Sequence, residues 1–318
     1  MESVNHVAGN GNLTEELLDA IKANTEAVRE ANSSDQLNVT LERQTNEIKG
    51  LGQKLDQLSR ELIATRKNLA VVRLQVANDT LDDVSGFVRG RQLSFEDTMS
   101  RLVDGTASFS RFGDGELQMM MSPTYNLGFQ RNNEYIRRNL RSVFTAEVKS
   151  NLLIGFPQVF RDVHGAQVWS QIWSELKRLV PPGLMYGNSH VSRPFYFSYA
   201  GEKGAQAWRS VWDGKTVCVI TGKGSRFDLI PELFSNVKDS EFLLSLPRDA
   251  DRDLDRLLEA ANGMEPDLFL ISLGPAGTVL SARLAAAGKR AIDIGHISNS
   301  YMNVFSKATT PERLPAEK

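Results

Sequence analysis

The sequence predicts an α/β domain with a largely parallel sheet and helices on both faces, preceded by a long α-helical coiled coil. Two patterns predict this. After about residue 90, apolar strand-like runs alternate with helix-like stretches, and before it the chain carries a heptad repeat. Composition changes at the same place, because residues 1–86 contain no Phe, Tyr, Trp or Pro. A stretch without aromatic residues lacks the large side chains that dominate compact cores, but it can form a long helix. We therefore divide the chain into a helical region, 1–86, and an α/β domain, 87–318.

The heptad repeat defines one apolar seam. With Ile48 at an a position, every a and d residue is apolar except Gln44 and Thr65, and the seam reads Leu37, Leu41, Gln44, Ile48, Leu51, Leu55, Leu58, Leu62, Thr65, Leu69, Val72 and Val76. Such a seam predicts a coiled coil, and hence a homo-oligomer. The alternative is a monomeric helical hairpin, because an amphipathic stretch at 13–31 precedes the seam and is separated from it by Asn32-Ser33-Ser34-Asp35, which resembles a helix break and a new N-cap.

The region after residue 90 alternates between two kinds of segment. Strand-like runs lie at 107–112, 151–156, 216–221, 241–246, 267–273 and 290–294, and helix-like stretches at 132–149, 167–180, 230–236, 251–262 and 278–287. This alternation predicts a mainly parallel sheet. Ligands of such sheets bind beyond the carboxyl ends of the strands, so the loops that leave the strands are where a site is expected.

Composition excludes several classes of protein. The net charge of -2 gives no polyanion-binding signature, so a nucleic-acid partner is not expected. Cys218 is the only cysteine, which excludes a disulfide framework and predicts a buried apolar residue. No window has the ~18 consecutive apolar residues of a transmembrane helix, and no secretory signal is visible. We expect a cytoplasmic protein, and peripheral attachment to the inner membrane face stays open.

The loop after the strand at 107–112 carries two carboxylates, Asp114 and Glu116, around Gly115. Carboxylates at this spacing can converge on one hard cation that also bridges diphosphate oxygens and acts as a Lewis acid. The alternative is a helix start, with Asp114 as the N-cap and Glu116 stabilised by the helix dipole.

Two glycine-rich loops follow other strands. Residues 221–226 combine Gly222 and Gly224 with the cations Lys223 and Arg226, and a loop of this kind can approach a phosphate or can be a plain turn. Residues 272–278 place Gly274 before a predicted helix, although tight packing alone would explain that glycine. Neither loop is a Walker A sequence or a complete Gly-x-Gly-x-x-Gly fingerprint.

His296 stands at the end of the last predicted strand. It is a candidate diphosphate contact, metal neighbour or proton carrier, and the alternative is simply a hydrogen-bonded residue. The polar and aromatic segment 186–196 offers Arg193 to hold a phosphate and Tyr196 to stack on a base or sugar; surface-loop decoration is the alternative. The pairs Trp169/Trp173 and Trp208/Trp212 have helical i, i+4 spacing and are interpreted as core.

In order along the chain, these loops resemble the GT-D-type bacterial glycosyltransferases, which have a Rossmann-like fold and a DxE motif. The matching segments are Arg111-Phe-Gly-Asp-Gly-Glu116, Asn151-Leu-Leu-Ile-Gly155, Ser192-Arg-Pro194, Trp212-Asp-Gly-Lys-Thr-Val217, Leu273-Gly-Pro-Ala276 and Ile292-Asp-Ile-Gly-His296. They span roughly residues 90–305, nearly all of the chain outside the heptads.

The resemblance implies transfer of a sugar from a nucleotide donor, a UDP-sugar, to a glycan or glycoprotein acceptor. It implies Mn2+ or Mg2+ at Asp114 and Glu116, and catalytic roles for these two residues and His296. Donor contacts are implied for Arg111, Gly113, Gly115, Arg193, Gly222, Lys223, Gly224, Arg226, Asp249 and Gly274.

Two departures from the family pattern bear on activity. Asp249-Ala250 stands where the family has Asn-Ala, and Ser298-Asn299-Ser300-Tyr301-Met302-Asn303 lacks the acidic residue that tends to follow the His. A catalytically degenerate transferase-like domain in a coiled-coil scaffold protein is therefore the alternative. A different nucleotide-binding Rossmann enzyme, such as a dehydrogenase, is disfavoured by the incomplete glycine fingerprint.

Overall fold

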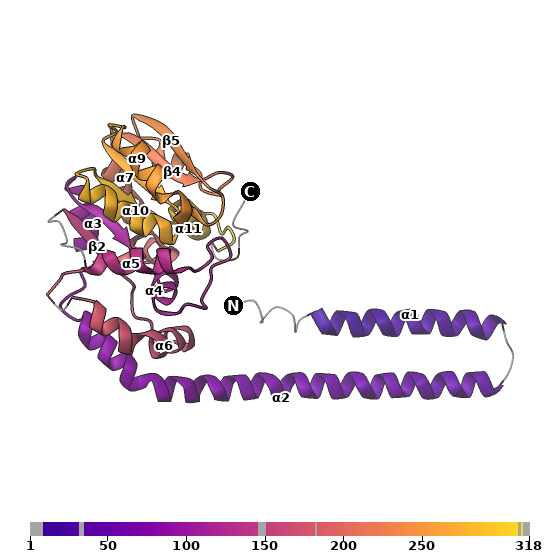
Figure 1. Cartoon of the computed structure of the whole chain (residues 1–318). Helices are drawn as coiled ribbons and strands as arrows, with labels where there is room; N and C mark the ends of the chain where they lie inside the picture. Colours follow the sequence, from indigo (N-terminus) through magenta and orange to yellow (C-terminus); the bar gives the residue numbers. More distant parts are fainter. Residues whose placement is uncertain (1–8, 32–34, 146–150, 182, 311–312, 314–318) are drawn as a thin grey trace. The chain divides into compact units, whose positions relative to one another are not determined.

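The computed structural model describes residues 9–31, 35–145, 151–181, 183–310 and 313 (Figure 1). They belong to two compact units, Met1–Gln75 and Val76–Lys318. The first unit holds α1 (Gly9–Ala31) and most of α2 (Asp35–Val88); the last turns of α2 belong to the second. Between the two helices lies the predicted break, and residues 32–34 are outside the described part of the chain.

In the first unit, α1 lies against the beginning of α2. Partly buried residues recur on α1 at spacings of four and three, at Thr14, Leu18, Ile21, Thr25 and Val28. The last three of them line a groove whose α2 side includes Leu41 and Ile48, two of the predicted seam positions. The hairpin alternative therefore describes this part of the molecule, with α1 covering the early part of the seam.

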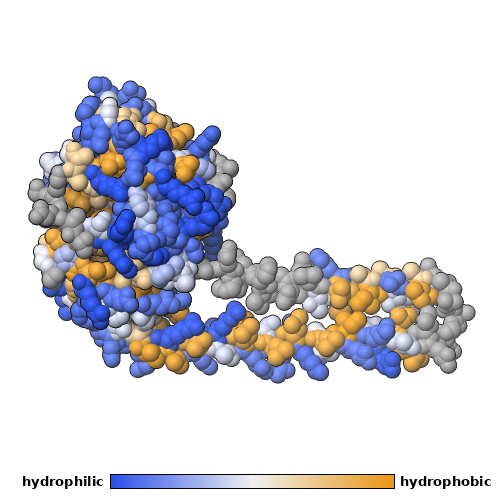
Figure 2. Space-filling model, viewed as in Figure 1, coloured by the Kyte–Doolittle hydropathy of each residue, from blue (hydrophilic) through white to orange (hydrophobic). Residues whose placement is uncertain are grey.

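The later part of the seam on α2 is exposed. Figure 2 shows apolar residues along its surface, and seven seam residues are solvent-exposed: Leu51, Leu55, Leu58, Leu62, Leu69, Val72 and Val76. A helix in water does not normally present a continuous apolar stripe, so this surface is suited to a partner helix.

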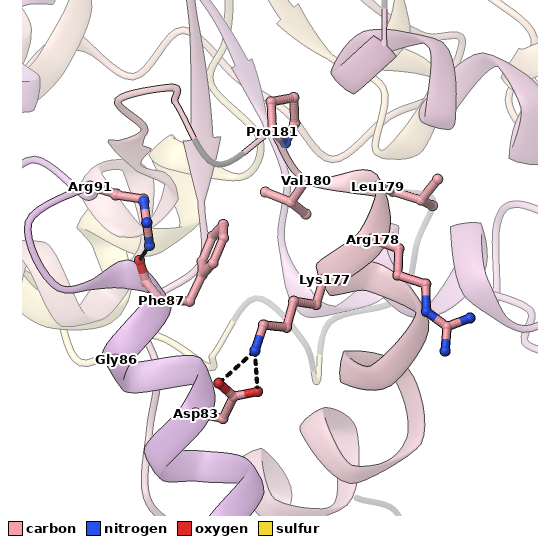
Figure 3. A pocket seen from close by; sticks show the side chains of 9 residues that line it. All are labelled: Asp83, Gly86, Phe87, Arg91, Lys177, Arg178, Leu179, Val180 and Pro181. Atoms are coloured by element: carbon pink, nitrogen blue, oxygen red, sulfur yellow. Dashed lines mark hydrogen bonds and ion pairs between the residues drawn. The ribbon is translucent and has the colours of Figure 1, made fainter.

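The end of α2 is part of the second unit, because Ala77, Leu81, Val84 and Phe87 are buried there. The carboxylate of Asp83 accepts hydrogen bonds from Trp173 Nε1 (2.8 Å) and Lys177 Nζ (2.8 Å) on α6 (Val163–Leu179). Figure 3 shows the contact between Asp83 and Lys177, which both line a pocket of about 630 Å³. The second unit thus begins inside α2, before the aromatic residues appear.

Seven strands form the sheet of the second unit, all parallel, in the order β3-β2-β1-β7-β6-β4-β5. Their bounds are β1 (Ser108–Arg111), β2 (Leu152–Phe156), β3 (Gly187–Asn188), β4 (Thr216–Gly222), β5 (Asp239–Ser245), β6 (Leu268–Ser272) and β7 (Ala291–Asp293). The predicted parallel α/β fold is confirmed. All six predicted strands are present, and β3 was missed because two residues leave no periodic pattern.

Helices cover both faces of this sheet, as Figure 1 shows. Besides α6, they are α3 (Phe95–Val103), α4 (Asp114–Met121), α5 (Glu134–Thr145), α7 (Pro194–Trp212), α8 (Pro231–Phe234), α9 (Leu254–Asn262), α10 (Pro275–Ala286) and α11 (Ile297–Phe305), with 3-10 turns at Ser189–Ser192 and Ala250–Asp253. The five predicted helices are present, and residues 146–149 of the first lie outside the described residues. Helices α3 and α11 were not predicted. A helix at α4 was considered only as the alternative at Asp114, and α7 was indicated only by the helical spacing of Trp208 and Trp212.

Consecutive residues of β1 and of β7 show which helices lie on each face of the sheet. Phe109 and Ile292 belong to the core that the sheet forms with α3, α7, α8 and α11. Their neighbours Ser110 and Asp293 contact Thr278 of α10, which packs with α5 and α9. Because side chains alternate across a strand, these two groups of helices lie on opposite faces.

The tryptophans are core residues, as predicted. Trp169 and Trp173 are buried with ring centroids 6.0 Å apart, and Trp208 and Trp212 are buried and stacked at 5.5 Å. Each indole nitrogen of the second pair donates to a backbone carbonyl, Trp208 to Val191 and Trp212 to Leu233, which satisfies the buried donors. Cys218 is buried as well, and burial raises the pKa of its thiol to about 12.

Candidate functional site

The order of the strands creates a crevice between β1 and β7. From β1 the chain builds the sheet outward through β2 and β3, whereas the later strands fill the other side of β7. At such a switch point the loops leaving neighbouring strands diverge, and ligands bind between them. A cleft of about 400 Å³ lies here, and we call it the donor cleft after the ligand that the sequence predicts for these loops. Its lining is Arg111, Gly113, Asp114, Gly115, Glu116, Leu127, Gly128, Phe129, Ser189, His190, Arg193, Arg226, Gly274, Gly295 and His296.

The loop after β1 turns directly into α4. Gly113 is the N-cap residue, and Glu116 at N3 reaches back so that its Oε2 accepts a hydrogen bond from Gly113 N (2.8 Å). The helix-start alternative is therefore right in kind, but wrong in assigning the N-cap to Asp114. Glu116 is buried and partly committed to the cap, whereas Asp114 is the exposed first residue of the helix.

Asp114 pairs with His164 of α6, whose Nε2 lies 2.7 Å from Asp114 Oδ2. Burial among the cleft walls alone would raise the pKa of Asp114. The hydrogen bond and charge of His164, together with the charge of Arg193, outweigh this effect and lower the pKa. The same hydrogen bond raises the pKa of His164 above its ordinary value. Asp114 is thus an anion that faces the cleft and already attracts a cation.

Arg111 lies buried under the cleft. Its Nε is 3.8 Å from Asp293 Oδ1 and makes no hydrogen bond within the described part of the chain. The backbones of Gly113 and Gly295 approach the guanidinium closely, and a Cβ on Gly295 would lie 2.7 Å from Nη2. Only glycine leaves room for this cation, and the positive φ of Gly295 (+52°) also favours glycine.

Asp293 is the buried partner of Arg111. Its oxygens accept hydrogen bonds from Gly295 N (3.0 Å) and Thr278 Oγ1 (3.2 Å). Complete burial raises the pKa of Asp293 to about 7, despite the opposing effect of Arg111. Near neutral pH only part of the Asp293 carboxyls are ionised, so the charge of Arg111 is incompletely neutralised. Positive charge therefore remains below the floor of the cleft.

Arg193 and Arg226 bring two further cations to the cleft wall beside His296. The Nη2 of Arg226 lies 3.3 Å from His296 Nε2; because arginine only donates, this nitrogen accepts, which assigns the proton of the neutral ring to Nδ1. Burial, followed by the charges of Arg193, Arg226 and Arg111, lowers the pKa of His296 far below its usual value. The ring is neutral, and an anion in the cleft would interact with arginines rather than with an imidazolium.

His190 is a second neutral histidine of the cleft. Burial lowers its pKa to about 3, and its Nδ1 accepts a hydrogen bond from Gln158 N (3.1 Å). The ring proton is therefore on Nε2. Next to it, the buried hydroxyl of Ser189 makes no hydrogen bond to any residue that the structure describes.

A smaller apolar pocket adjoins the donor cleft and shares Phe129, Arg226, Gly274 and His296 with it. It has a volume of about 60 Å³, and its remaining lining is Gly222, Ser225, Leu246, Pro247, Arg248, Ala250, Ser272 and Leu273. Gly274 permits this shape, because a Cβ there would lie 2.5 Å from the Phe129 ring and the residue has a φ of +54°.

Nine of the predicted site residues line the donor cleft: Arg111, Gly113, Asp114, Gly115, Glu116, Arg193, Arg226, Gly274 and His296. Gly222 lines the adjoining pocket. Lys223 and Gly224 line neither cavity, and Lys223 is exposed. The side chain of Asp249 holds Arg131 (Nε to Oδ2, 2.8 Å), and its N–H donates to Phe129 O (3.0 Å), so it supports the loop that carries Phe129 instead of lining the cleft.

Four site residues escaped the prediction: His164, His190, Ser189 and Phe129. His164 follows β2, a strand whose exit loop (157–162) carries no glycine motif, and its pairing with Asp114 depends on β2 lying beside β1. Ser189 and His190 follow the unpredicted β3. Their sequence signal was the polar segment 186–196, which pointed instead to Arg193 and Tyr196; Tyr196 is buried in the core.

Among the described residues that line the cleft, Asp114 and Glu116 are the ones with carboxylates. Across the described residues, no cluster of three or more His, Cys, Asp or Glu side chains is arranged to hold a metal ion. No helix that the structure describes is both long and apolar enough to cross a membrane.

The fold and the cleft define a class of protein, a Rossmann-like α/β protein with a cationic cleft at the switch point of its sheet. Residues 109–317 match the family model described as "Glycosyltransferase GT-D fold". The chain therefore belongs to the GT-D-fold glycosyltransferase family, and the predicted resemblance is confirmed.

Known relatives agree with this assignment. The chain is 24% identical over 248 residues to "Glycosyltransferase GlyD" of Streptococcus pneumoniae serotype 4, covering 73% of this chain but 30% of that protein. A solved structure described as "The highly conserved domain of unknown function 1792 has a distinct glycosyltransferase fold" matches with a TM-score of 0.66 and 24% identity, over 76% of this chain and 90% of that chain. "A New Glycosyltransferase (DUF1792) from Streptococcus sanguinis" matches with a TM-score of 0.62 and 24% identity, over 71% and 89%.

Replacing Gly295 with Ala tests the packing around Arg111. The new Cβ would collide with the guanidinium, which adds roughly 1–3 kcal/mol to the backbone cost of a positive φ. Chemical denaturation followed by tryptophan fluorescence measures the loss, since all four tryptophans lie in the second unit. Gly288→Ala is the matched control: it also has a positive φ (+83°), but nothing lies within 4 Å of its Cβ. Equal losses in the two variants would contradict this account of Gly295.

The buried carboxyl of Asp293 predicts a pH dependence of stability. Its pKa rises from 3.8 to about 7 on folding, so between these values the folded chain keeps a proton that the unfolded chain releases. Its contribution to stability is complete below about pH 4 and is lost as the pH rises through 7. The unfolding free energy of the wild type should fall between pH 5 and pH 8. In Asp293→Asn this fall should be smaller by roughly 2–3 kcal/mol. Asp104 is exposed, and Asp104→Asn should show the same dependence of unfolding free energy on pH as the wild type. The same dependence in Asp293→Asn would refute the assignment.

Proposed function

We propose that this protein is a metal-dependent glycosyltransferase that moves a sugar from a nucleotide donor, a UDP-sugar, to a glycan or glycoprotein acceptor. One observation carries the proposal. Loops leaving β1, β3, β4, β6 and β7 meet at one cleft, where three arginines face two carboxylates. Arginines suit the phosphates of a donor, and carboxylates suit a divalent cation that accompanies them.

The two cavities have chemistries that match the two halves of such a donor. In our proposal, the diphosphate lies against Arg193, Arg226 and the neutral ring of His296 in the donor cleft. The nucleoside extends into the adjoining pocket beside Phe129, whose ring offers an apolar surface for a base. The sugar then lies toward Asp114 and His190, where the Nε2–H of His190 is a fixed neutral donor for a hydroxyl or phosphate oxygen.

The carboxylates fit a cation that arrives together with the diphosphate. Asp114 is ionised and faces the cleft, but Glu116 commits one oxygen to the cap of α4. Two carboxylates alone are few ligands for a preformed site, yet Mg2+ and similar ions at phosphate-transfer sites are often held by one or two carboxylates plus substrate phosphates. When bound, the cation would supply Lewis-acid stabilisation of the charge on the departing nucleoside diphosphate.

The residues of the chain have complementary tasks in this scheme. The guanidinium groups of Arg193 and Arg226 stabilise the leaving diphosphate, and Arg111 strengthens the field from below. The imidazole of His296, held by Arg226, orients that cationic wall. His164 holds the carboxylate of Asp114, and a bound cation would compete with it for that carboxylate.

A catalytically degenerate domain is the alternative. No acidic residue occurs in α11 (Ile297–Phe305), and its serines are buried, with Ser298 Oγ donating to Asp228 O (2.5 Å). Such a domain would bind the nucleotide without turning over the donor, which separates the two proposals.

Nucleotide binding can be measured by thermal denaturation with UDP and Mn2+. At 100 times Kd, UDP stabilises by about 2.7 kcal/mol, or roughly 5–10 °C for a domain of this size. We expect UDP with Mn2+ to give a larger shift than UDP alone, and Mn2+ alone to give almost none. Asp114→Asn should lose the Mn2+-dependent part while Asp104→Asn keeps it.

The absence of any shift with UDP, or an undiminished Mn2+ effect in Asp114→Asn, would argue against the proposed donor site. Release of free sugar from UDP-sugars by the wild type would support the transferase. Binding without release would support the degenerate alternative.

We also propose that the chain forms a homo-oligomer through the exposed seam of α2, with a second copy as the partner, and that it works in the cytoplasm or peripherally at the inner membrane face. Seam residues from Leu51 to Val76 lie outside the groove with α1 or at its edge, and parallel pairing would bring Glu61 opposite Arg66.

The mass in solution tests this oligomer. Light scattering should give a multiple of 35.3 kDa for the wild type. Leu58→Gln with Leu62→Gln should lower the mass toward one copy, because polar residues at a and d positions remove the apolar seam. Val71→Gln is the matched control, being 65% exposed but off the seam. A wild-type mass of one copy would refute the proposal.

A further inference from the structure

A row of aromatic rings leads away from the donor cleft. Phe160 follows β2, Phe95 begins α3, and Phe195 and Tyr199 lie one turn apart on α7. Ring centroids are 5.3 Å apart between Phe160 and Phe195, 6.0 Å between Phe195 and Phe95, and 5.4 Å between Phe95 and Tyr199. We call these four residues the aromatic strip.

The strip is continuous with the cleft. The ring of His190, which lines the cleft, lies 5.2 Å from that of Phe160 in an edge-to-face contact. At the same point Ser189 lines the cleft, and its buried hydroxyl has no hydrogen-bond partner among the described residues. Most buried hydroxyls have a partner, so the inner end of the strip has unused hydrogen-bonding capacity.

The outer part of the strip is exposed although its neighbours are buried. Tyr196 and Phe197 of α7 pack in the core, whereas Phe195 is 46% exposed and Tyr199 is 62% exposed. The buried face of α7 is enough to pack this helix against the core. The exposed rings of Phe195 and Tyr199 are therefore not needed for its packing. Contiguous exposed aromatic residues next to a cleft commonly mark a binding surface.

We propose that the aromatic strip is the acceptor-binding site, and that its occupant is the sugar ring of a glycan. This inference rests on the proposed transferase function. A pyranose has an apolar face of C–H groups that fits against a flat aromatic ring, whose face is electronegative. Sugar hydroxyls need polar partners at the edges, and the carboxylate of Glu96 bonds the Tyr199 hydroxyl at the outer end. At the inner end the side chain of Ser189 has a hydroxyl without a partner among the described residues.

The position of the strip favours an acceptor over other ligands. A nucleobase has the apolar pocket beside Phe129. This pocket shares Phe129, Arg226, Gly274 and His296 with the cleft, and its lining does not include His190. A protein partner would need a broad apolar area, whereas the residues next to the strip in sequence include the exposed polar residues Glu96, Asp97 and Ser198. A glycan chain matches a narrow track that ends where the donor sugar is expected.

Binding of the full-length chain to an array of oligosaccharides and glycopeptides tests this directly. The wild type should bind a subset of glycans, and Phe195→Ala with Tyr199→Ala should reduce binding to that subset at least tenfold. Phe242→Ala is the matched control, because its ring is 50% exposed on β5 at the far edge of the sheet. It should bind as the wild type does.

Several results would overturn the proposal. Unchanged glycan binding in the double variant would do so, as would a wild type that binds no glycan on the array. A change in oligomeric mass with unchanged glycan binding would identify the strip as a protein interface. The UDP-dependent thermal shift of the wild type is measured separately, so failure of the acceptor site and failure of the donor site are distinguishable.

Discussion

The donor cleft depends on one buried cation, the guanidinium of Arg111 at the end of β1. Its counter-ion, Asp293, lies at the end of the adjacent strand β7, so the pair spans the switch point of the sheet. A buried arginine keeps its charge, whereas burial shifts the carboxyl toward the protonated form. The result is net positive charge under the cleft floor. Gly113 and Gly295 make this arrangement possible, because neither places a side chain between Arg111 and the cleft.

This charge shapes the chemistry of the residues above it. Arg193 and Arg226 add to the same field. Burial, helped by the charges of nearby arginines, holds the pKa of His296 and that of His190 below the physiological range. The cleft therefore contains permanent cations and neutral imidazoles instead of a group of titrating histidines. An anionic ligand satisfies such a field over a wide pH range. Asp114 differs from these cations and neutral rings, because it is an exposed anion. Its pairing with His164 keeps it ionised and oriented.

Strand-end loops could be predicted from sequence, but the direction of their side chains could not. Arg111, Asp114, Arg226, Gly274 and His296 were found because each follows an apolar run, and the carboxyl ends of parallel strands share one edge. Lys223 follows such a run as well, yet its side chain is exposed, because its N–H continues the ladder to Ser245 O (2.9 Å). His164 was missed because its role depends on the order of the strands, which apolar periodicity does not encode. The short β3 and the helix α7, interrupted at Gly201, likewise lack a regular pattern.

The supply of carboxylates constrains the chemistry more than the shape of the cleft does. Within its lining only Asp114 and Glu116 are acidic, and Glu116 already accepts a hydrogen bond that caps α4. If Asp114 holds a cation with the donor, it is not available as a general base for the acceptor hydroxyl. The two histidines of the lining are poor substitutes: one nitrogen of each already accepts a hydrogen bond, and their low pKa values make them weak bases. In the proposed transferase, catalysis would therefore rely on stabilising the leaving diphosphate and positioning the acceptor, and the proposed acceptor track, which begins at His190, lies where such positioning would act.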